Sequence, residues 1–131
     1  MADALKIGVA GLGTVGASLV RIISERHENL ATACGRAITV TAVSARDRSK
    51  DRGIDVTSAT WYDDPAAMAR EGDIDVLVEL IGGASGAAKD AVNAALERGI
   101  HVVTANKALL AEDGVALAAL AEEKGVLLNF E

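Results

Sequence analysis

The fold is decided near the start of the chain, by the stretch Leu5-Lys6-Ile7-Gly8-Val9-Ala10-Gly11-Leu12-Gly13-Thr14-Val15-Gly16. Residues 5–10 predict a short buried strand, and apolar residues at helical spacing from Val15 to Ile23 predict a helix directly after it. A G-x-G-x-x-G motif alone is a weak signal, but one that joins a strand to a helix is typical of a dinucleotide-binding turn. The position of the motif therefore predicts a ligand site at the start of the first helix.

Each glycine of the motif has an expected task. Gly11 permits a tight turn, Gly13 lets the backbone approach a pyrophosphate, and Gly16 lets the helix pack closely on the strand. The first turn of the helix then offers free N–H groups and a positive dipole end to the phosphates. The alternative is a glycine-rich turn with no ligand, and the strand-to-helix context favours binding.

Strands and helices alternate along the rest of the chain. Further strands are predicted at residues 37–43, 61–62, 74–80, 100–103 and 126–130. Helices are predicted from residue 65, at 85–98, and at 107–124 with an interruption at Asp113-Gly114. Ser85 is expected to cap the second of these helices and Gly99 to end it, while the polar stretch 29–36 closes the first unit. This alternation predicts an α/β fold with a Rossmann-like, doubly wound, mostly parallel sheet and helices on both faces.

The composition describes one acidic domain. The chain has 131 residues, half of them apolar and only 2% aromatic, so small aliphatic side chains must fill the core. Its net charge of −6 argues against a nucleic-acid partner, which would require clustered positive charge. The first residues, from Met1 to Lys6, do not have the pattern of a signal peptide, and no apolar run reaches the ~18 residues of a membrane helix. We therefore expect a cytoplasmic protein without a membrane partner.

The cysteine and histidine residues predict neither a disulfide nor a metal site. Cys34 is the only cysteine, so no disulfide can form within the chain, and we expect its thiol to be packed. His27 and His101 have no cysteine or carboxylate at a useful ligand spacing. Both are expected at the surface or at a strand edge.

The residues after the second strand bear on the choice between NAD and NADP. An acidic residue there would bind the adenosine ribose hydroxyls, but the sequence has Ser44-Ala45-Arg46. Arg46 can pair with a 2′-phosphate, and three more basic residues follow it at positions 48, 50 and 52. The alternative is a solvated loop, since Asp47 and Asp51 offset part of the charge. The pattern favours NADP modestly and leaves NAD open.

Two later clusters lie at predicted carboxyl ends of strands. Gly82-Gly83 follows the fourth strand, where the glycines would admit a ligand or simply form a turn. In the stretch 104–107, Asn106 is expected to cap the next helix. A cation at Lys107 interacts unfavourably with the helix dipole, at a cost of about 0.3–1 kcal/mol in stability, which indicates a nearby anion or reacting group. A solvated surface lysine is the alternative.

Together these motifs resemble the cofactor domain of homoserine dehydrogenase along essentially the whole chain. The resemblance rests on the glycine motif and on three further stretches: Glu79-Leu80-Ile81-Gly82-Gly83, Val102-Val103-Thr104-Ala105-Asn106-Lys107-Ala108-Leu109-Leu110-Ala111, and Asn129-Phe130-Glu131. It implies NAD(P)-dependent interconversion of aspartate 4-semialdehyde and homoserine, a step toward threonine, methionine and isoleucine. The segment 84–87 departs from the family, which has a proline-containing stretch there.

The resemblance also implies roles for individual residues. Cofactor contacts are implied for Gly11, Leu12, Gly13, Thr14, Val15, Gly16, Arg46, Gly82, Gly83, Thr104, Ala105 and Lys107. Lys107 matches the family lysine that reaches the nicotinamide and the substrate, so it is the expected catalytic residue, stabilising a developing alkoxide. Glu131 matches the glutamate that begins a monovalent-cation turn.

The resemblance implies a two-domain enzyme of which residues 1–131 are the NAD(P)-binding domain. The substrate and dimerisation domain is absent from this chain, so we expect the chain alone to be inactive and the full-length protein to be a homodimer. Two alternatives stay open: the domain of another amino-acid or semialdehyde dehydrogenase, and a free-standing dinucleotide-sensing module.

Overall fold

The predicted strands all enter one sheet in the computed structural model, which describes residues 3–130. The six strands are β1 (Leu5–Ala10), β2 (Ile38–Ser44), β3 (Thr60–Tyr62), β4 (Val76–Glu79), β5 (His101–Thr104) and β6 (Leu128–Phe130). They are parallel and lie in the order β3-β2-β1-β4-β5-β6. This order reverses direction between β1 and β4, and it confirms the Rossmann-like, doubly wound class.

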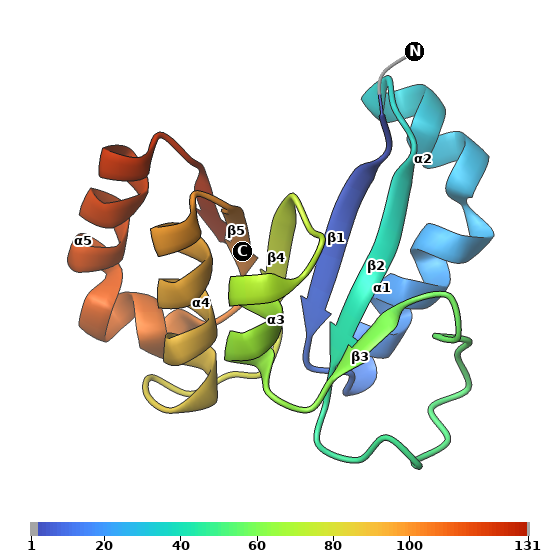
Figure 1. Ribbon diagram of the computed structural model, residues 1–131, viewed down its shortest axis with the longest axis horizontal. Helices are drawn as coiled ribbons and strands as arrows, with labels where there is room; N and C mark the ends of the chain where they lie inside the picture. Colours follow the sequence, from blue (N-terminus) through green and yellow to red (C-terminus); the bar gives the residue numbers. More distant parts are fainter. Residues whose placement is uncertain (1–2, 131) are drawn as a thin grey trace.

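Helices cover both faces of the sheet (Figure 1). One face carries α1 (Thr14–Glu25) and α2 (His27–Cys34), and the other carries α3 (Pro65–Glu71), α4 (Ala87–Arg98) and α5 (Lys107–Lys124). The core is correspondingly divided into two apolar layers. Val9, Val43 and Val78 meet α1, whereas Leu77 and Val102 meet α4 and its neighbours. Strands buried on both faces explain why the sequence shows apolar runs rather than alternation.

The last helix differs from the prediction. The interruption expected at Asp113-Gly114 is wrong, because α5 runs unbroken for 18 residues. A Cβ at Gly114 would meet only the Leu110 side chain, at 3.9 Å, so the glycine marks no special backbone. Packing of Leu109 and Leu117 in the core, together with a 3.4 Å ion pair between Lys89 and Asp113, outweighs the low helix propensity of one glycine.

Three local predictions near helix ends are also corrected. The stretch 29–36 is largely helix α2, which buries no residue and so gave no apolar periodicity. Cys34 ends this helix and is exposed rather than packed. Ser85 does not cap α4, because Gly86 precedes the helix and no side chain caps it. Gly99 does end α4 with positive φ, and Pro65 begins α3, as predicted.

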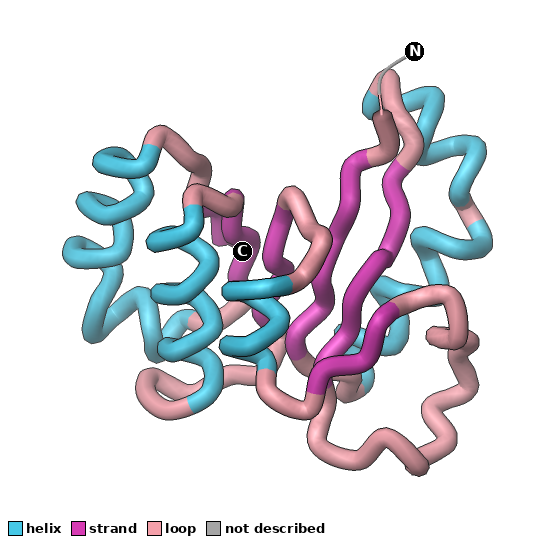
Figure 2. Tube along the Cα trace, in the orientation of Figure 1, coloured by secondary structure: helices cyan, strands magenta, loops and turns pink. Residues whose placement is uncertain are grey.

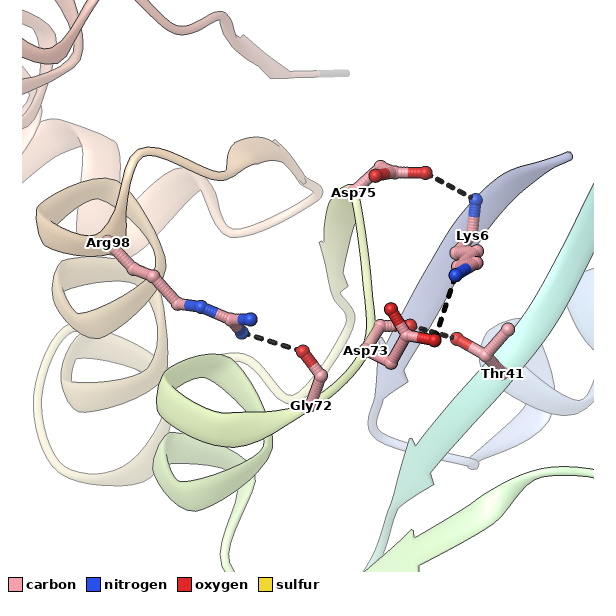
Figure 3. A network of polar contacts seen from close by, with 6 residues as sticks. All are labelled: Lys6, Thr41, Gly72, Asp73, Asp75 and Arg98. Atoms are coloured by element: carbon pink, nitrogen blue, oxygen red, sulfur yellow. Dashed lines mark hydrogen bonds and ion pairs between the residues drawn. The ribbon is translucent and has the colours of Figure 1, made fainter. Parts of the chain in front are cut away.

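A polar network ties the sheet together at the amino ends of the strands (Figure 3). The Lys6 ammonium contacts the Asp73 carboxylate at 2.8 Å, and the Lys6 backbone N–H donates to Asp75 at 2.9 Å. The Thr41 hydroxyl donates to the Asp73 carbonyl at 2.7 Å, which adds β2 to the network. The Arg98 guanidinium donates to the Gly72 carbonyl at 2.7 Å and so attaches α4. These contacts join β1, β2, α4 and the segment before β4 at the amino edge of the sheet, opposite the loops at its carboxyl edge.

Candidate functional site

The loops after β1, β2 and β4 gather at the carboxyl edge of the sheet (Figure 1). They enclose a cavity of about 500 Å³ at the point where the strand order reverses. Its lining is Gly11, Leu12, Gly13, Ser44, Ala45, Arg46, Lys50, Arg52, Asp63, Pro65, Leu80, Ile81 and Ala87. A crevice at this switch point is where open α/β sheets bind their ligands.

The glycine turn has the shape that a pyrophosphate requires. Gly11 has φ of +99°, and a Cβ there would approach the Leu80 carbonyl at 2.9 Å, so the turn needs a glycine. A Cβ on Gly13 would meet no protein atom within 4 Å, because this residue faces the cavity. A Cβ on Gly16 would collide with the Gly11 carbonyl oxygen. Steric exclusion thus explains two of the glycines, while Gly13 leaves room for a ligand.

The start of α1 is open to an anion. Gly13 precedes the helix without a capping side chain, and no acidic residue lies in the first turn. The first N–H groups and the positive dipole end therefore face the cavity with no carboxylate in the first turn of the helix. Thr14 and Val15 are exposed beside this turn, and Leu12 is buried beneath it. These features fit the phosphates of a dinucleotide.

A long loop joins β2 to β3 (Figure 2), and its basic side chains form another wall of the cavity. Arg46, Lys50 and Arg52 line it, so the predicted arginine has two cationic neighbours. The Arg52 guanidinium lies 5.6 Å from the Trp61 ring centroid, within cation–π range. A hydrogen bond from the Ser49 hydroxyl lowers the pKa of Asp47 and folds that carboxylate back onto its own turn. Asp47 therefore faces its own turn, and the cationic side chains face the cavity.

A second, smaller hollow of about 130 Å³ lies at the ends of β4 and β5. Its lining is Val15, Glu79, Leu80, Ile81, Gly82, Ala105 and Asn106. Gly82 and Gly83 both have positive φ, so the loop after β4 needs glycine at both positions. The predicted Gly82 and Ala105 are thus brought together with Val15 of the glycine turn.

Beneath this hollow lies a buried polar network that sequence reasoning missed. The Glu79 side chain is fully buried, and its carboxylate accepts hydrogen bonds from the Ile81 and Gly82 N–H groups at 2.8 and 3.0 Å. Its other oxygen accepts from the Thr104 hydroxyl at 2.7 Å. The available signal was an acidic residue in an otherwise apolar strand, followed by two glycines.

The network continues into the start of α5. The Asn106 N–H donates to the Thr104 hydroxyl at 3.0 Å, and the Asn106 amide donates to the Gly83 carbonyl at 2.5 Å. The Asn106 side-chain oxygen accepts from the Leu109 N–H, which confirms the predicted cap. The Thr104 side chain is thus used inside the protein, and the residue as a whole is buried. Lys107 is exposed as the first residue of α5.

The remaining predicted site residue is not placed. Glu131, the predicted cation ligand, lies outside the described residues. Within residues 3–130, no three His, Cys, Asp or Glu side chains gather in a way that could hold a metal ion. His27 is exposed, and His101 begins β5 and accepts a hydrogen bond from the Leu127 N–H at 3.0 Å.

Comparison with known proteins identifies the family. Residues 11–131 match the family model of the homoserine dehydrogenase NAD-binding domain. The chain belongs to the homoserine dehydrogenase family. Homoserine dehydrogenase of Neisseria gonorrhoeae is 42% identical over 127 residues, which are 97% of this chain. That of Mycobacterium tuberculosis is 41% identical over 131 residues, covering 98%.

Solved structures of the family share the fold. Homoserine dehydrogenase of S. aureus superposes with a TM-score of 0.88 at 35% identity, over 100% of this chain and 33% of that chain. The Thiobacillus denitrificans homoserine dehydrogenase gives 0.88 at 34% identity, over 98% of this chain and 30% of that one. The chain spans 29% of the length of the two curated relatives named above.

The family membership confirms the resemblance that the motifs predicted. The chain matches the NAD-binding domain of this family, which supports a nicotinamide cofactor. The findings favour neither another semialdehyde dehydrogenase nor a sensing module. Among the helices of residues 3–130, none is both long and apolar enough to cross a membrane.

Proposed function

We propose that this chain is the cofactor-binding part of an enzyme that interconverts aspartate 4-semialdehyde and homoserine. The observation that carries the proposal is the cavity of about 500 Å³ between the glycine turn and the basic loop, in a domain of the homoserine dehydrogenase family. When bound, the nicotinamide cofactor supplies the hydride chemistry, and the residues of this chain hold and orient it.

The proposed contacts follow the two halves of the site. In this proposal the residues of the glycine turn, Gly11, Leu12, Gly13, Thr14, Val15 and Gly16, hold the pyrophosphate at the start of α1. The adenosine half lies over β1–β3 and the nicotinamide half over β4–β6, as in other doubly wound dinucleotide domains. Gly82, Gly83, Thr104 and Ala105 are the proposed contacts of the nicotinamide half.

The proposed preference is for NADP. Arg46, Lys50 and Arg52 line the adenosine half, and no acidic side chain follows Ser44 at the end of β2. Paired with a 2′-phosphate, a guanidinium forms charge-assisted hydrogen bonds that stabilise binding by about 1.5–3 kcal/mol. NADP is therefore expected to bind more tightly than NAD.

Calorimetric titration of the 131-residue chain with NADP and NAD tests this preference. Arg46→Asp should weaken NADP binding about tenfold to a hundredfold and change NAD binding little, because it removes a phosphate partner and adds a repelling charge. Arg26→Asp, at the opposite end of α1, is the matched control. An unchanged NADP-to-NAD ratio in Arg46→Asp would show that Arg46 is solvated surface.

The remaining parts of the proposal concern the whole enzyme. Lys107 is the proposed catalytic residue, a cation at the ligand edge that stabilises the developing alkoxide. The substrate domain, the homodimer interface, the monovalent-cation turn begun by Glu131 and a cytoplasmic location are proposed from the family.

The isolated chain should not oxidise homoserine, while a protein that joins it to a substrate domain should. Turnover by the chain alone would refute the two-domain assignment.

A further inference from the structure

We propose that Glu79 is a positioning residue that pre-forms the nicotinamide half of the cofactor site. This inference rests on the proposed function, since it concerns how that site is built. Glu79 is fully buried at the end of β4, and both of its carboxylate oxygens are used. Through them it holds the loop after β4 and the junction between β5 and α5 in one arrangement.

The hydrogen-bond pattern requires an acceptor at both oxygens. Two backbone N–H groups point at one oxygen, and the Thr104 hydroxyl points at the other. The same hydroxyl already accepts from the Asn106 N–H. A carboxylate accepts all three donors, and charge-assisted hydrogen bonds of this kind are stronger than those between neutral groups.

A glutamine at this position would leave a donor unpaired in either orientation. With its NH₂ toward the loop, it opposes the Ile81 and Gly82 N–H groups. With its NH₂ toward Thr104, the glutamine donates to the Thr104 hydroxyl, which already accepts from the Asn106 N–H. The hydroxyl would then accept two hydrogen bonds, and its own proton would have no acceptor. A buried donor left unpaired costs about 1–3 kcal/mol.

The loop that Glu79 holds has a backbone that needs such support. Gly82 and Gly83 have φ of +90° and +86°, and a Cβ on Gly82 would meet no atom within 4 Å. The two glycines have no side chain to pack, so hydrogen bonds to Glu79 and Asn106 hold this part of the loop. Without them, cofactor binding would have to order the loop, and that entropy cost would appear as lower affinity.

The location of the network predicts an effect on only half of the cofactor. Glu79 and Thr104 lie at the ends of β4 and β5, whereas the larger cavity is lined mainly by the start of the glycine turn and the basic loop, and the loop after β4 reaches it only through Leu80 and Ile81. Loss of the carboxylate should therefore weaken a ligand that reaches over β4 and spare one that stops at the adenosine half.

The test compares two ligands on the 131-residue chain by calorimetry: NADP, and adenosine 2′,5′-bisphosphate as the adenosine half alone. Glu79→Gln should weaken NADP binding about tenfold and leave adenosine 2′,5′-bisphosphate binding unchanged. Thr104→Val, which removes the hydroxyl partner with little change of shape, should act in the same direction. Glu97→Gln, at a surface ion pair with Lys124, is the matched control and should change neither affinity.

The outcomes distinguish a positioning role of Glu79 from a general structural role and from no role. Equal weakening of both ligands would show a general structural role, and no weakening of NADP would show that the loop needs no carboxylate; either overturns the proposal. If Glu79→Gln does not fold, the same comparison on Thr104→Val decides. A wild-type chain that binds neither ligand would refute the proposed function itself, a result distinct from either failure of Glu79.

Discussion

At the turn after β1, Gly13 and Gly16 meet opposite surroundings. A Cβ on Gly13 faces open space, whereas a Cβ on Gly16 would collide with the Gly11 carbonyl oxygen. Gly13→Ser should keep the melting temperature, because serine is a favoured N-cap, and should weaken NADP binding about tenfold or more by filling the cavity. Gly16→Ala should instead destabilise the fold by about 1–3 kcal/mol. Thermal melts and titrations of both variants check this contrast, and normal NADP binding by Gly13→Ser would refute a ligand at that backbone.

Lys107 presents a different residue-scale question, because it is a cation in the first turn of α5. Within residues 3–130, no carboxylate forms an ion pair with Lys107. Its charge interacts unfavourably with the helix dipole, which costs about 0.3–1 kcal/mol in stability. Lys107→Ala should therefore keep or slightly raise the melting temperature, while strongly lowering homoserine turnover in a protein that includes the substrate domain. Lys89→Ala, which removes the ion pair with Asp113, is the control. Normal turnover with an early melt would show that Lys107 is structural.

At the scale of elements, α5 shows how packing decides the length of a helix. Gly114 lies inside the helix with room for a methyl group, so Gly114→Ala should stabilise the protein by about 1 kcal/mol. Gly125 ends the same helix with φ of +69°, and Gly125→Ala should destabilise it because alanine rarely adopts that backbone. Denaturant unfolding of the two variants measures both signs. A destabilised Gly114→Ala would contradict a continuous α5.

At the scale of the whole molecule, Lys6 joins β1 to the segment that leads into β4. Hydrogen bonding to Asp73, and the charge of Asp73, raise the pKa of Lys6 above its ordinary 10.5. A raised pKa in the folded state means that the contact stabilises the protein fully below the ordinary pKa, and that this contribution is lost as pH rises through the folded value. Wild type and Lys6→Met should therefore differ in melting temperature at neutral pH and converge as the pH rises past 10.5 and through the higher pKa of the folded state.

Melts of both proteins across the alkaline range check this convergence. Lys124→Met is the control, because Lys124 pairs with Glu97 at 3.7 Å between two neighbouring helices rather than across the sheet. A constant difference between wild type and Lys6→Met at all pH values would show that the Lys6 charge does not matter.

Features that depend on contacts within a few residues could be predicted from the amino-acid sequence alone. The glycine motif fixes the turn between β1 and α1, because the backbone has positive φ at Gly11 and leaves no room for a Cβ at Gly16. The Asn106 cap and the Gly99 stop are local in the same way. Apolar strands alternating with helices were enough to predict the parallel sheet, since strands buried on both faces require covering helices.

Features that depend on partners far apart in the sequence could be seen only in the folded structure. Glu79 stands 25 residues from the Thr104 hydroxyl that it binds, and the parallel pairing of β4 with β5 brings the two together. The gathering of Arg46, Lys50 and Arg52 beside the glycine turn depends likewise on β2 lying next to β1. Packing against the rest of the protein also explains two features that the sequence did not predict. Helix α5 is continuous because it packs on the core, and Cys34 is exposed because α2 buries no residue. A local pattern states which residues can be buried, whereas the register of the sheet decides which buried polar groups meet.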